Sequence, residues 1–259
     1  MASGDSGVIL TIQASAGPRS GANLRVLITG AGGGVGYACA RAFAARGADL
    51  ILSDIDGQAL KLASNNLSAT GRFCDVASEA SVAIFAAEVA RSHGSIDVLI
   101  NAAGKGYVRN LGTMRITRAF LPMMKSDGGK KHIVNVASMA PRPAQSGCAF
   151  PYAGSQDAFD RLSEALAENV RGTAVALTTV IPSPELPAEK GAAALAVATP
   201  HGVEHDDLDR VAAAIIDAVQ SGKTLPGQAT RLAGPVEPHA PDENGGVIPF
   251  ERRAGKPRN

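Results

Sequence analysis

A glycine-rich turn between an apolar strand and a small-residue helix constrains this chain more than any other feature. Residues 25–36 read R-V-L-I-T-G-A-G-G-G-V-G, and an alanine-rich helical pattern continues to Ala45. A strand, a glycine turn and a helix in direct succession bind a pyrophosphate, because glycines let the backbone approach the ligand and first-turn N–H groups point at it. We therefore predict a dinucleotide-binding turn whose cofactor contacts are Gly30, Gly32, Gly33, Gly34, Val35 and Gly36.

Asp54 follows the second predicted strand, residues 48–53. A carboxylate at this distance from the glycine turn accepts hydrogen bonds from the adenosine ribose hydroxyls and repels a 2′-phosphate. Neither Gly33 nor Ile55 supplies the basic side chain that a 2′-phosphate needs. NAD is therefore favoured over NADP as the cofactor. The alternative is that Asp54 only caps the turn that follows, a role that Asp56 fills equally well.

Alternating strand and helix patterns extend from residue 25 to residue 234. Further strands are predicted at 72–76, 96–100, 132–138, 174–181 and 228–234, and helices at 58–67, 79–92, 152–171 and 206–221. Such alternation produces parallel strands joined by right-handed crossovers. We predict a single α/β domain, a Rossmann-like, doubly wound parallel sheet with helices on both faces. Residues 1–24 are predicted to be a loose leader or an extra edge strand, and residues 235–259 a loose tail.

Composition narrows the functional classes. Of the 259 residues, 45% are hydrophobic and 19% charged, and the formal net charge of +1 argues against nucleic acid or an anionic membrane as a partner. No apolar run reaches the ~20 residues that cross a bilayer. The three dispersed cysteines lack metal-ligand spacing and favour a reduced, cytoplasmic protein. Aromatic residues make up only 4%, so we expect aliphatic and small side chains to line a pocket for an apolar small molecule.

Several separated motifs together resemble the short-chain dehydrogenase/reductase family. They are T-G-A-G-G-G-V-G at 29–36, Asp75-Val76, N-A-A-G at 101–104, and Ser138 followed by Tyr152. The resemblance implies a homodimer or homotetramer that binds a nicotinamide dinucleotide. It also implies further cofactor contacts from Asp75, Val76, Asn101, Ala102, Ala103, Gly104, Lys105 and Pro182.

The catalytic motif departs from the family pattern at one position. The resemblance implies that Ser138 hydrogen-bonds the substrate oxygen and that Tyr152 is the general acid or, as phenolate, the base. The family's Y-x-x-x-K reads Y-A-G-S-Q here, so Gln156 stands where a lysine binds the ribose and lowers the pKa of the tyrosine. Gln156 can hydrogen-bond a ribose hydroxyl but carries no charge. A neutral Tyr152 still donates a proton, so reduction is less affected than oxidation.

The segment after Gly104 is shorter than in the family. Counted back from Pro122, the family's catalytic asparagine falls on Arg109, while Asn110 comes one place later and is turned by ~100° on the helix. The shortening also brings two cations, Lys105 and Arg109, close to the cofactor motif. Either both are solvated or loosely bound to the pyrophosphate, or one of them replaces the charge of the missing lysine.

The predicted function is that of an NAD(H)-dependent oxidoreductase that interconverts a carbonyl and a secondary alcohol, in the reductive direction. Two alternatives stay open. One is a catalytically impaired NAD-binding or scaffold protein of the same fold. The other is a non-redox isomerase, lyase or cyclase that uses Ser138 and Tyr152 in the same pocket. The fold alone does not decide among these three functions.

Overall fold

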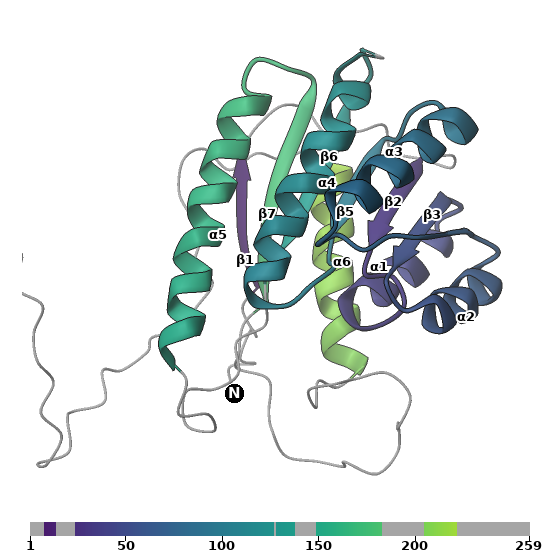
Figure 1. The fold of residues 1–259 in the computed structure, drawn as a ribbon, viewed down its shortest axis with the longest axis horizontal. Helices are drawn as coiled ribbons and strands as arrows, with labels where there is room; N and C mark the ends of the chain where they lie inside the picture. The colour runs from purple at the N-terminus through teal and green to yellow at the C-terminus, as the bar shows by residue number, and fades with distance from the viewer. Residues whose placement is uncertain (1–7, 14–23, 127, 138–148, 183–204, 222–259) are drawn as a thin grey trace, which may run out of the picture.

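The computed structural model describes residues 8–13, 24–126, 128–137, 149–182 and 205–221 (Figure 1). Its centre is a seven-stranded sheet in the order β1-β7-β6-β5-β2-β3-β4. The strands are β1 (Val8–Gln13), β2 (Arg25–Thr29), β3 (Asp49–Asp54), β4 (Thr70–Phe73), β5 (Val98–Asn101), β6 (Lys131–Val136) and β7 (Val175–Pro182). The six strands from β2 to β7 pair in parallel, and the order reverses between β2 and β5. The predicted doubly wound sheet is confirmed.

Helices cover both faces of this sheet. They are α1 (Gly34–Ala44), α2 (Gly57–Leu67), α3 (Glu79–His93), α4 (Gly106–Ser126), α5 (Ala149–Val170) and α6 (His205–Ser221). One core cluster joins α1, α2 and α6 to one face, and a second joins α3, α4 and α5 to the other (Figure 1). Successive strand residues point to opposite faces, so Val26 and Ile28 enter the first cluster and Leu27 the second. Because both faces are covered, the strands are continuous apolar runs.

The region before β2 contributes a strand to the edge of the sheet. Residues Val8–Gln13 form β1, which pairs antiparallel with β7, with Val8 opposite Pro182. This pairing gives β7 a partner on its outer side. The strand predicted at 228–234 and the loose tail predicted at 235–259 lie outside the described residues.

Two predicted strands end earlier in the structure. The strand predicted at 72–76 is β4, which ends at Phe73, because Asp75 begins a turn in which it accepts hydrogen bonds from the Ala77 and Ser78 N–H groups. The strand predicted at 132–138 is β6, which ends at Val136. The helix predicted from 152 begins earlier, at Ala149.

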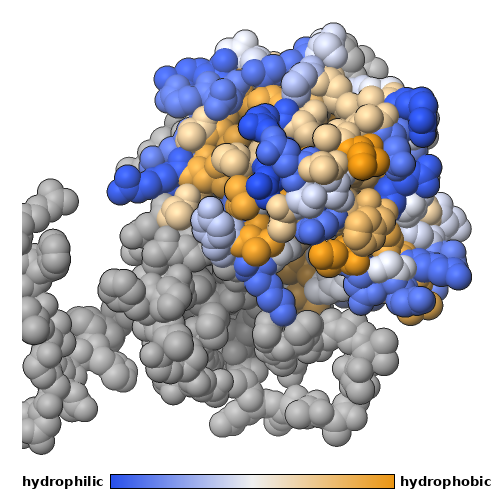
Figure 2. Space-filling view, viewed as in Figure 1, coloured by the Kyte–Doolittle hydropathy of each residue, from blue (hydrophilic) through white to orange (hydrophobic). Residues whose placement is uncertain are grey.

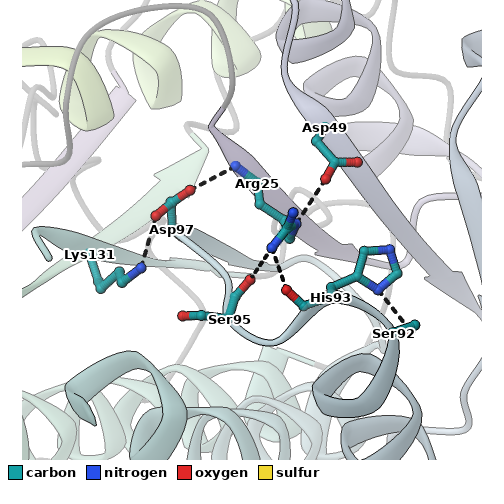
Figure 3. Close-up of polar contacts among 7 residues, drawn as sticks. All are labelled: Arg25, Asp49, Ser92, His93, Ser95, Asp97 and Lys131. Atoms are coloured by element: carbon teal, nitrogen blue, oxygen red, sulfur yellow. Dashed lines mark hydrogen bonds and ion pairs between the residues drawn. The ribbon is translucent and has the colours of Figure 1, made fainter. Parts of the chain in front are cut away.

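A charged cluster, which we call the amino-edge cluster, joins the amino ends of the parallel strands (Figure 3). Asp97 accepts one hydrogen bond from the Arg25 N–H at 2.9 Å and another from Lys131 Nζ at 2.8 Å. The Arg25 side chain also pairs with Asp49 at 2.8 Å. Lys131 is buried, with a side chain only 4% exposed. The amino-edge cluster therefore fastens β2, β3, β5 and β6 together at one edge of the sheet.

The surface seen in Figure 2 mixes hydrophilic and hydrophobic side chains over the helices of one face. Among the large apolar side chains that stay exposed are Tyr107, Val108 and Met114 of α4. Among the helices described, none is long and apolar enough to cross a membrane.

Candidate functional site

The glycine turn is packed so closely that two of its positions have no room for a side chain. Gly30 has φ of 69°, and a Cβ added there would lie 2.8 Å from the Ala103 Cα. A Cβ on Gly36 would lie 2.1 Å from the Gly30 carbonyl oxygen. The turn thus brings the backbone between β2 and α1 against the loop that follows β5. Both loops lie at the carboxyl ends of strands next to the reversal of strand order, where open α/β sheets bind ligands.

The N-terminus of α1 is open to an anion. Gly33 precedes the helix in extended conformation, without a side-chain cap, and the first turn holds no acidic residue. Uncapped first-turn N–H groups and the positive end of the helix dipole attract a phosphate. The uncapped end of α1 and the close approach of the two loops are the geometry expected of the residues predicted to bind the pyrophosphate of a dinucleotide.

Asp54 lies at the end of β3 and binds the glycine turn. Its carboxylate accepts hydrogen bonds from the Gly32 N–H at 2.8 Å and from the Asp56 N–H at 2.9 Å. The next helix is capped by Asp56, which accepts from the Gln58 and Ala59 N–H groups. Asp54 and Asp56 therefore have separate roles. A carboxylate offers about four acceptor sites, so Asp54, which is only partly buried, keeps capacity for ribose hydroxyls.

Asp75 and Val76 lie beyond β4. The Asp75 carboxylate accepts from the Ala77 N–H at 2.9 Å, within the turn that leads to α3. Val76 is 7% exposed and packs on α4, since a Cβ on Gly112 would lie 2.6 Å from Val76 Cγ2. In the structure Val76 is thus a core residue, while Asp75 stays partly exposed beside it.

The loop after β5 is held by a buried polar network. Thr29 Oγ1 accepts hydrogen bonds from the N–H groups of Ala102 and Ala103 at 3.2 and 3.3 Å. The buried Asn101 amide donates to Asn135 Oδ1 at 2.9 Å and to Thr117 Oγ1 at 3.0 Å. This network fixes the loop at the edge of the sheet.

Sequence reasoning assigned no role to three members of this network, Thr29, Thr117 and Asn135. A polar residue inside an apolar run is a usable signal, and Asn135 within H-I-V-N-V is an example. Its partners become visible only once β5, β6 and α4 are known to be neighbours.

Arg109 reaches the same edge from the first turn of α4. Its Nη1 donates to the Val136 carbonyl at 2.9 Å and, more weakly, to the Ala102 carbonyl at 3.4 Å. Burial lowers the pKa of the guanidinium from 12.5 to about 10. Only Lys105 separates the 101–104 loop from α4, which begins at Gly106. Arg109 therefore lies close to that loop: a Cβ on Gly104, whose φ is 87°, would lie 2.9 Å from the Arg109 Cα.

Asn110 and Lys105, the other two predicted residues of this segment, differ in exposure. Asn110 is buried, 9% exposed, and Lys105 is exposed. Of the two cations considered as replacements for the missing lysine, only Arg109 is therefore held at the ends of the strands.

The remaining predicted residues are only partly described. Ser138 lies outside the described residues. Tyr152 and Gln156 lie in the N-terminal part of α5, and Pro182 ends β7, but the side chains of these three residues lie outside the described part of the chain. The alternative that Arg109 or Lys105 replaces the charge of the missing lysine beside Tyr152 therefore stays a prediction. The glycine turn, Asp54, the 101–104 loop and Arg109 do lie together along the carboxyl edge of β3, β2, β5 and β6.

A family model described as short chain dehydrogenase matches residues 24–188. A probable oxidoreductase, EphD, from Mycobacterium tuberculosis is 33% identical over 180 residues. The match takes in 61% of this chain and 30% of that protein, so the chain spans about a third of the relative's length.

Two solved structures share the fold. One is a short chain dehydrogenase/reductase from Burkholderia phymatum in complex with NAD, 24% identical, with a TM-score of 0.61 over 76% of this chain and 86% of that one. The other is a metagenomic short-chain oxidoreductase in complex with NADP, also 24% identical, with a TM-score of 0.59 over 77% of this chain and 91% of that one.

Proposed function

Because the chain belongs to the short-chain dehydrogenase family, we propose that it is an NAD(H)-dependent oxidoreductase that interconverts a small carbonyl compound and its secondary alcohol, working mainly as a reductase. The observation that carries the proposal is the Asp54 carboxylate bound to the Gly32 N–H at 2.8 Å. It couples the end of β3 to a turn shaped for a pyrophosphate. The substrate and the direction of the reaction are part of the proposal.

Asp54 is also the argument for NAD over NADP. A 2′-phosphate brought to the ribose position would meet a fixed negative charge, because both carboxylate oxygens are already held by backbone N–H groups. Gly33 and Ile55 offer no compensating base. The family as a whole binds nicotinamide cofactors, and this feature is what favours NAD within it.

The chain's own residues divide the work of reduction. When bound, the reduced nicotinamide supplies a hydride to the carbonyl carbon. In our proposal Tyr152 gives its phenol proton to the carbonyl oxygen, and Ser138 donates a hydrogen bond to that oxygen. Gln156 hydrogen-bonds a ribose hydroxyl without adding charge. A neutral phenol suits proton donation in reduction and disfavours oxidation.

Calorimetry with NADH and NADPH at one salt concentration tests the cofactor, and NADH consumption with a panel of ketones and aldehydes tests the reaction. We expect tighter binding of NADH, and carbonyl-dependent oxidation of NADH. Tighter binding of NADPH contradicts the assignment of NAD. Binding of neither cofactor contradicts the function as a whole.

A second candidate function, an NAD-binding protein without turnover, is favoured by one observation, the uncharged Gln156. Gln156→Lys separates the two functions. In an oxidoreductase the added charge favours the phenolate, so oxidation of a secondary alcohol at pH 7 rises more than reduction of the matching ketone. The comparison uses chemical-step rates at saturating cofactor, since the overall equilibrium does not change. If NADH binds but neither direction proceeds in either protein, the binding function is correct.

Self-association and compartment complete the proposal. Tyr107 of α4 is 73% exposed, and Val108 and Met114 are also exposed, which supports a homodimer or homotetramer formed through this helix. Light scattering of the wild type and of Tyr107→Glu tests this, and we expect the variant to dissociate. The free, buried Cys39 and Cys74 support the reducing cytoplasm.

A further inference from the structure

Arg109 is a partly buried cation that forms no ion pair with a described residue. Its hydrogen bonds to described groups go to two main-chain carbonyls, through Nη1 alone. Its Nε is buried and has no partner within the described chain. Burial without a carboxylate is also why the pKa of this guanidinium falls to about 10. The side chain still carries its charge at neutral pH, and no carboxylate among the described residues neutralises it.

Arg109 also lies where the helix backbone is itself positive. It lies in the first turn of α4, where the helix dipole is already positive and where the turn holds no acidic residue. Acidic side chains stabilise such a position and basic ones destabilise it. Two positive sources thus meet at the carboxyl ends of β5 and β6, on the edge of the sheet that binds ligands.

The cofactor phosphates do not account for this charge. The pyrophosphate belongs to the N-terminus of α1, after β2, and the adenosine ribose to Asp54, after β3. Val136, which holds Arg109 Nη1, is on β6, two strands from β2 and three from β3. At ~4.8 Å per strand these separations are about 10 and 14 Å. Arg109 therefore faces the opposite half of the site, where the substrate meets the nicotinamide.

We propose that Arg109 binds a carboxylate of the substrate, so that the substrates are oxo acids and the corresponding hydroxy acids. This inference rests on the proposed oxidoreductase function and names its substrate class. Nη1 is occupied by the carbonyls, and the Nε–Nη2 edge makes no hydrogen bond to a described residue. The Nε and Nη2 N–H groups of an arginine are parallel and match the two oxygens of a carboxylate. The expected apolar lining of the pocket then accommodates the remainder of the acid.

Acids compared with their methyl esters test this directly, since esterification removes the charge and keeps the carbonyl to be reduced. The probes are 2-oxohexanoate and 4-oxopentanoate with their methyl esters, which place the ketone at two distances from the carboxylate. Affinity is measured by calorimetry on the chain with and without saturating NAD, and kcat/KM with NADH. We expect at least one acid to exceed its ester by about tenfold or more in both readouts.

Two matched variants locate the effect. Arg109→Met removes the charge and retains an unbranched, apolar side chain, and we expect the acid-to-ester ratio to fall to about one. Arg118→Met removes an exposed cation of the same helix, and we expect the ratio to persist. Equal affinity of acid and ester in the wild type overturns the inference, as does a ratio that survives Arg109→Met. The wild-type comparison decides even if Arg109→Met fails to fold.

Failure of the inference is distinguishable from failure of the proposed function. If NADH does not bind but the free chain prefers the acid and depends on Arg109, the carboxylate-binding role of Arg109 stands and the oxidoreductase function fails. If NADH is oxidised by ketones with equal preference for acid and ester, the function stands and the inference fails. If Arg109→Met instead shifts the pH–rate profile upward at an unchanged ratio, Arg109 acts on Tyr152, and the carboxylate role is overturned.

Discussion

A buried cation and a partly buried one lie at the two ends of the parallel strands, and only the first has a carboxylate partner among the described residues. At the amino edge, Lys131 pairs with Asp97 at 2.8 Å, inside the cluster drawn in Figure 3. At the carboxyl edge, Arg109 has carbonyl acceptors but no carboxylate among the described residues. The amino edge is electrostatically complete, whereas the carboxyl edge holds a charge that nothing described neutralises.

The difference indicates which edge serves stability and which serves binding. Removing a charge from water without pairing it is unfavourable, so the partly buried Arg109 by itself lowers the free energy of unfolding. Such locally unfavourable choices are expected at functional sites. Four variants test this contrast, from the largest expected effect to the smallest.

Gly36→Ala places a side chain at the carboxyl edge where the backbone is most tightly packed. The new Cβ would lie 2.1 Å from a main-chain oxygen, which cannot move without opening the turn. We expect a loss of about 2–4 kcal/mol in the free energy of unfolding and loss of measurable NADH binding. Urea unfolding and calorimetry measure the two effects. Gly57→Ala, where a Cβ meets open space, is the control and should alter neither.

Asp97→Ala breaks the amino edge by removing the carboxylate that pairs with the buried Lys131. We expect the free energy of unfolding to fall by about 2–3 kcal/mol, less than for a fully buried pair because the Asp97 side chain is 31% exposed. Lys131→Met should cost about 1 kcal/mol, since Asp97 keeps water and the Arg25 N–H. NADH affinity should stay unchanged in both variants. A large loss of affinity would show that the two edges are not independent.

Asp54→Asn sharpens the assignment of the adenosine side of the carboxyl edge. An amide replaces one carboxylate oxygen and removes the charge that opposes a 2′-phosphate. We expect the ratio of NADH to NADPH affinity to fall by about tenfold, or about 1.4 kcal/mol. Asp56→Asn, which keeps a helix-capping side chain, should leave the ratio as it is. An unchanged ratio in Asp54→Asn would remove the argument for NAD.

Arg109→Met should have the smallest effect on stability of the four variants. Its effect shows whether the carboxyl edge differs from the amino edge in how it neutralises a cation. Removing an unneutralised charge offsets the loss of two hydrogen bonds to carbonyls. The free energy of unfolding should therefore stay within about 1 kcal/mol of the wild type or rise. Urea unfolding beside Lys131→Met measures the contrast between the edges. A loss of about 3 kcal/mol would mean that Arg109 has a stabilising partner, and that the carboxyl edge is as complete as the amino edge.

Features that depend on local backbone geometry were predictable from the sequence. The glycine turn, the helices that follow it and the parallel order of the strands follow from spacing and periodicity alone, because Gly30 and Gly36 allow no substitute there. The end of β4 was predicted too late, since the turn at Asp75 depends on side-chain hydrogen bonds with little apolar signal.

Features that depend on distant neighbours were not predictable. The position of Arg109 in the sequence was identified, but its carbonyl acceptors, in the loop after β5 and on β6, require the sheet order. Asn135 and Thr117 meet Asn101 only in the folded chain. Whether residues 8–13 form a strand likewise depended on β7, which is their partner from the other end of the domain.

The pairing of β1 with β7 also limits the order in which the strands of the sheet can form. During synthesis β1 leaves the ribosome first, yet it pairs with β7, which is made after five other strands. Until then V-I-L-T-I-Q is an uncharged segment of high strand propensity without a neighbour, the kind that joins strands of other chains. Closing such a long-range pairing is slow, whereas β2 to β6 can form their sheet earlier. The yield of correctly folded protein therefore depends on how well β1 is shielded while it waits for β7.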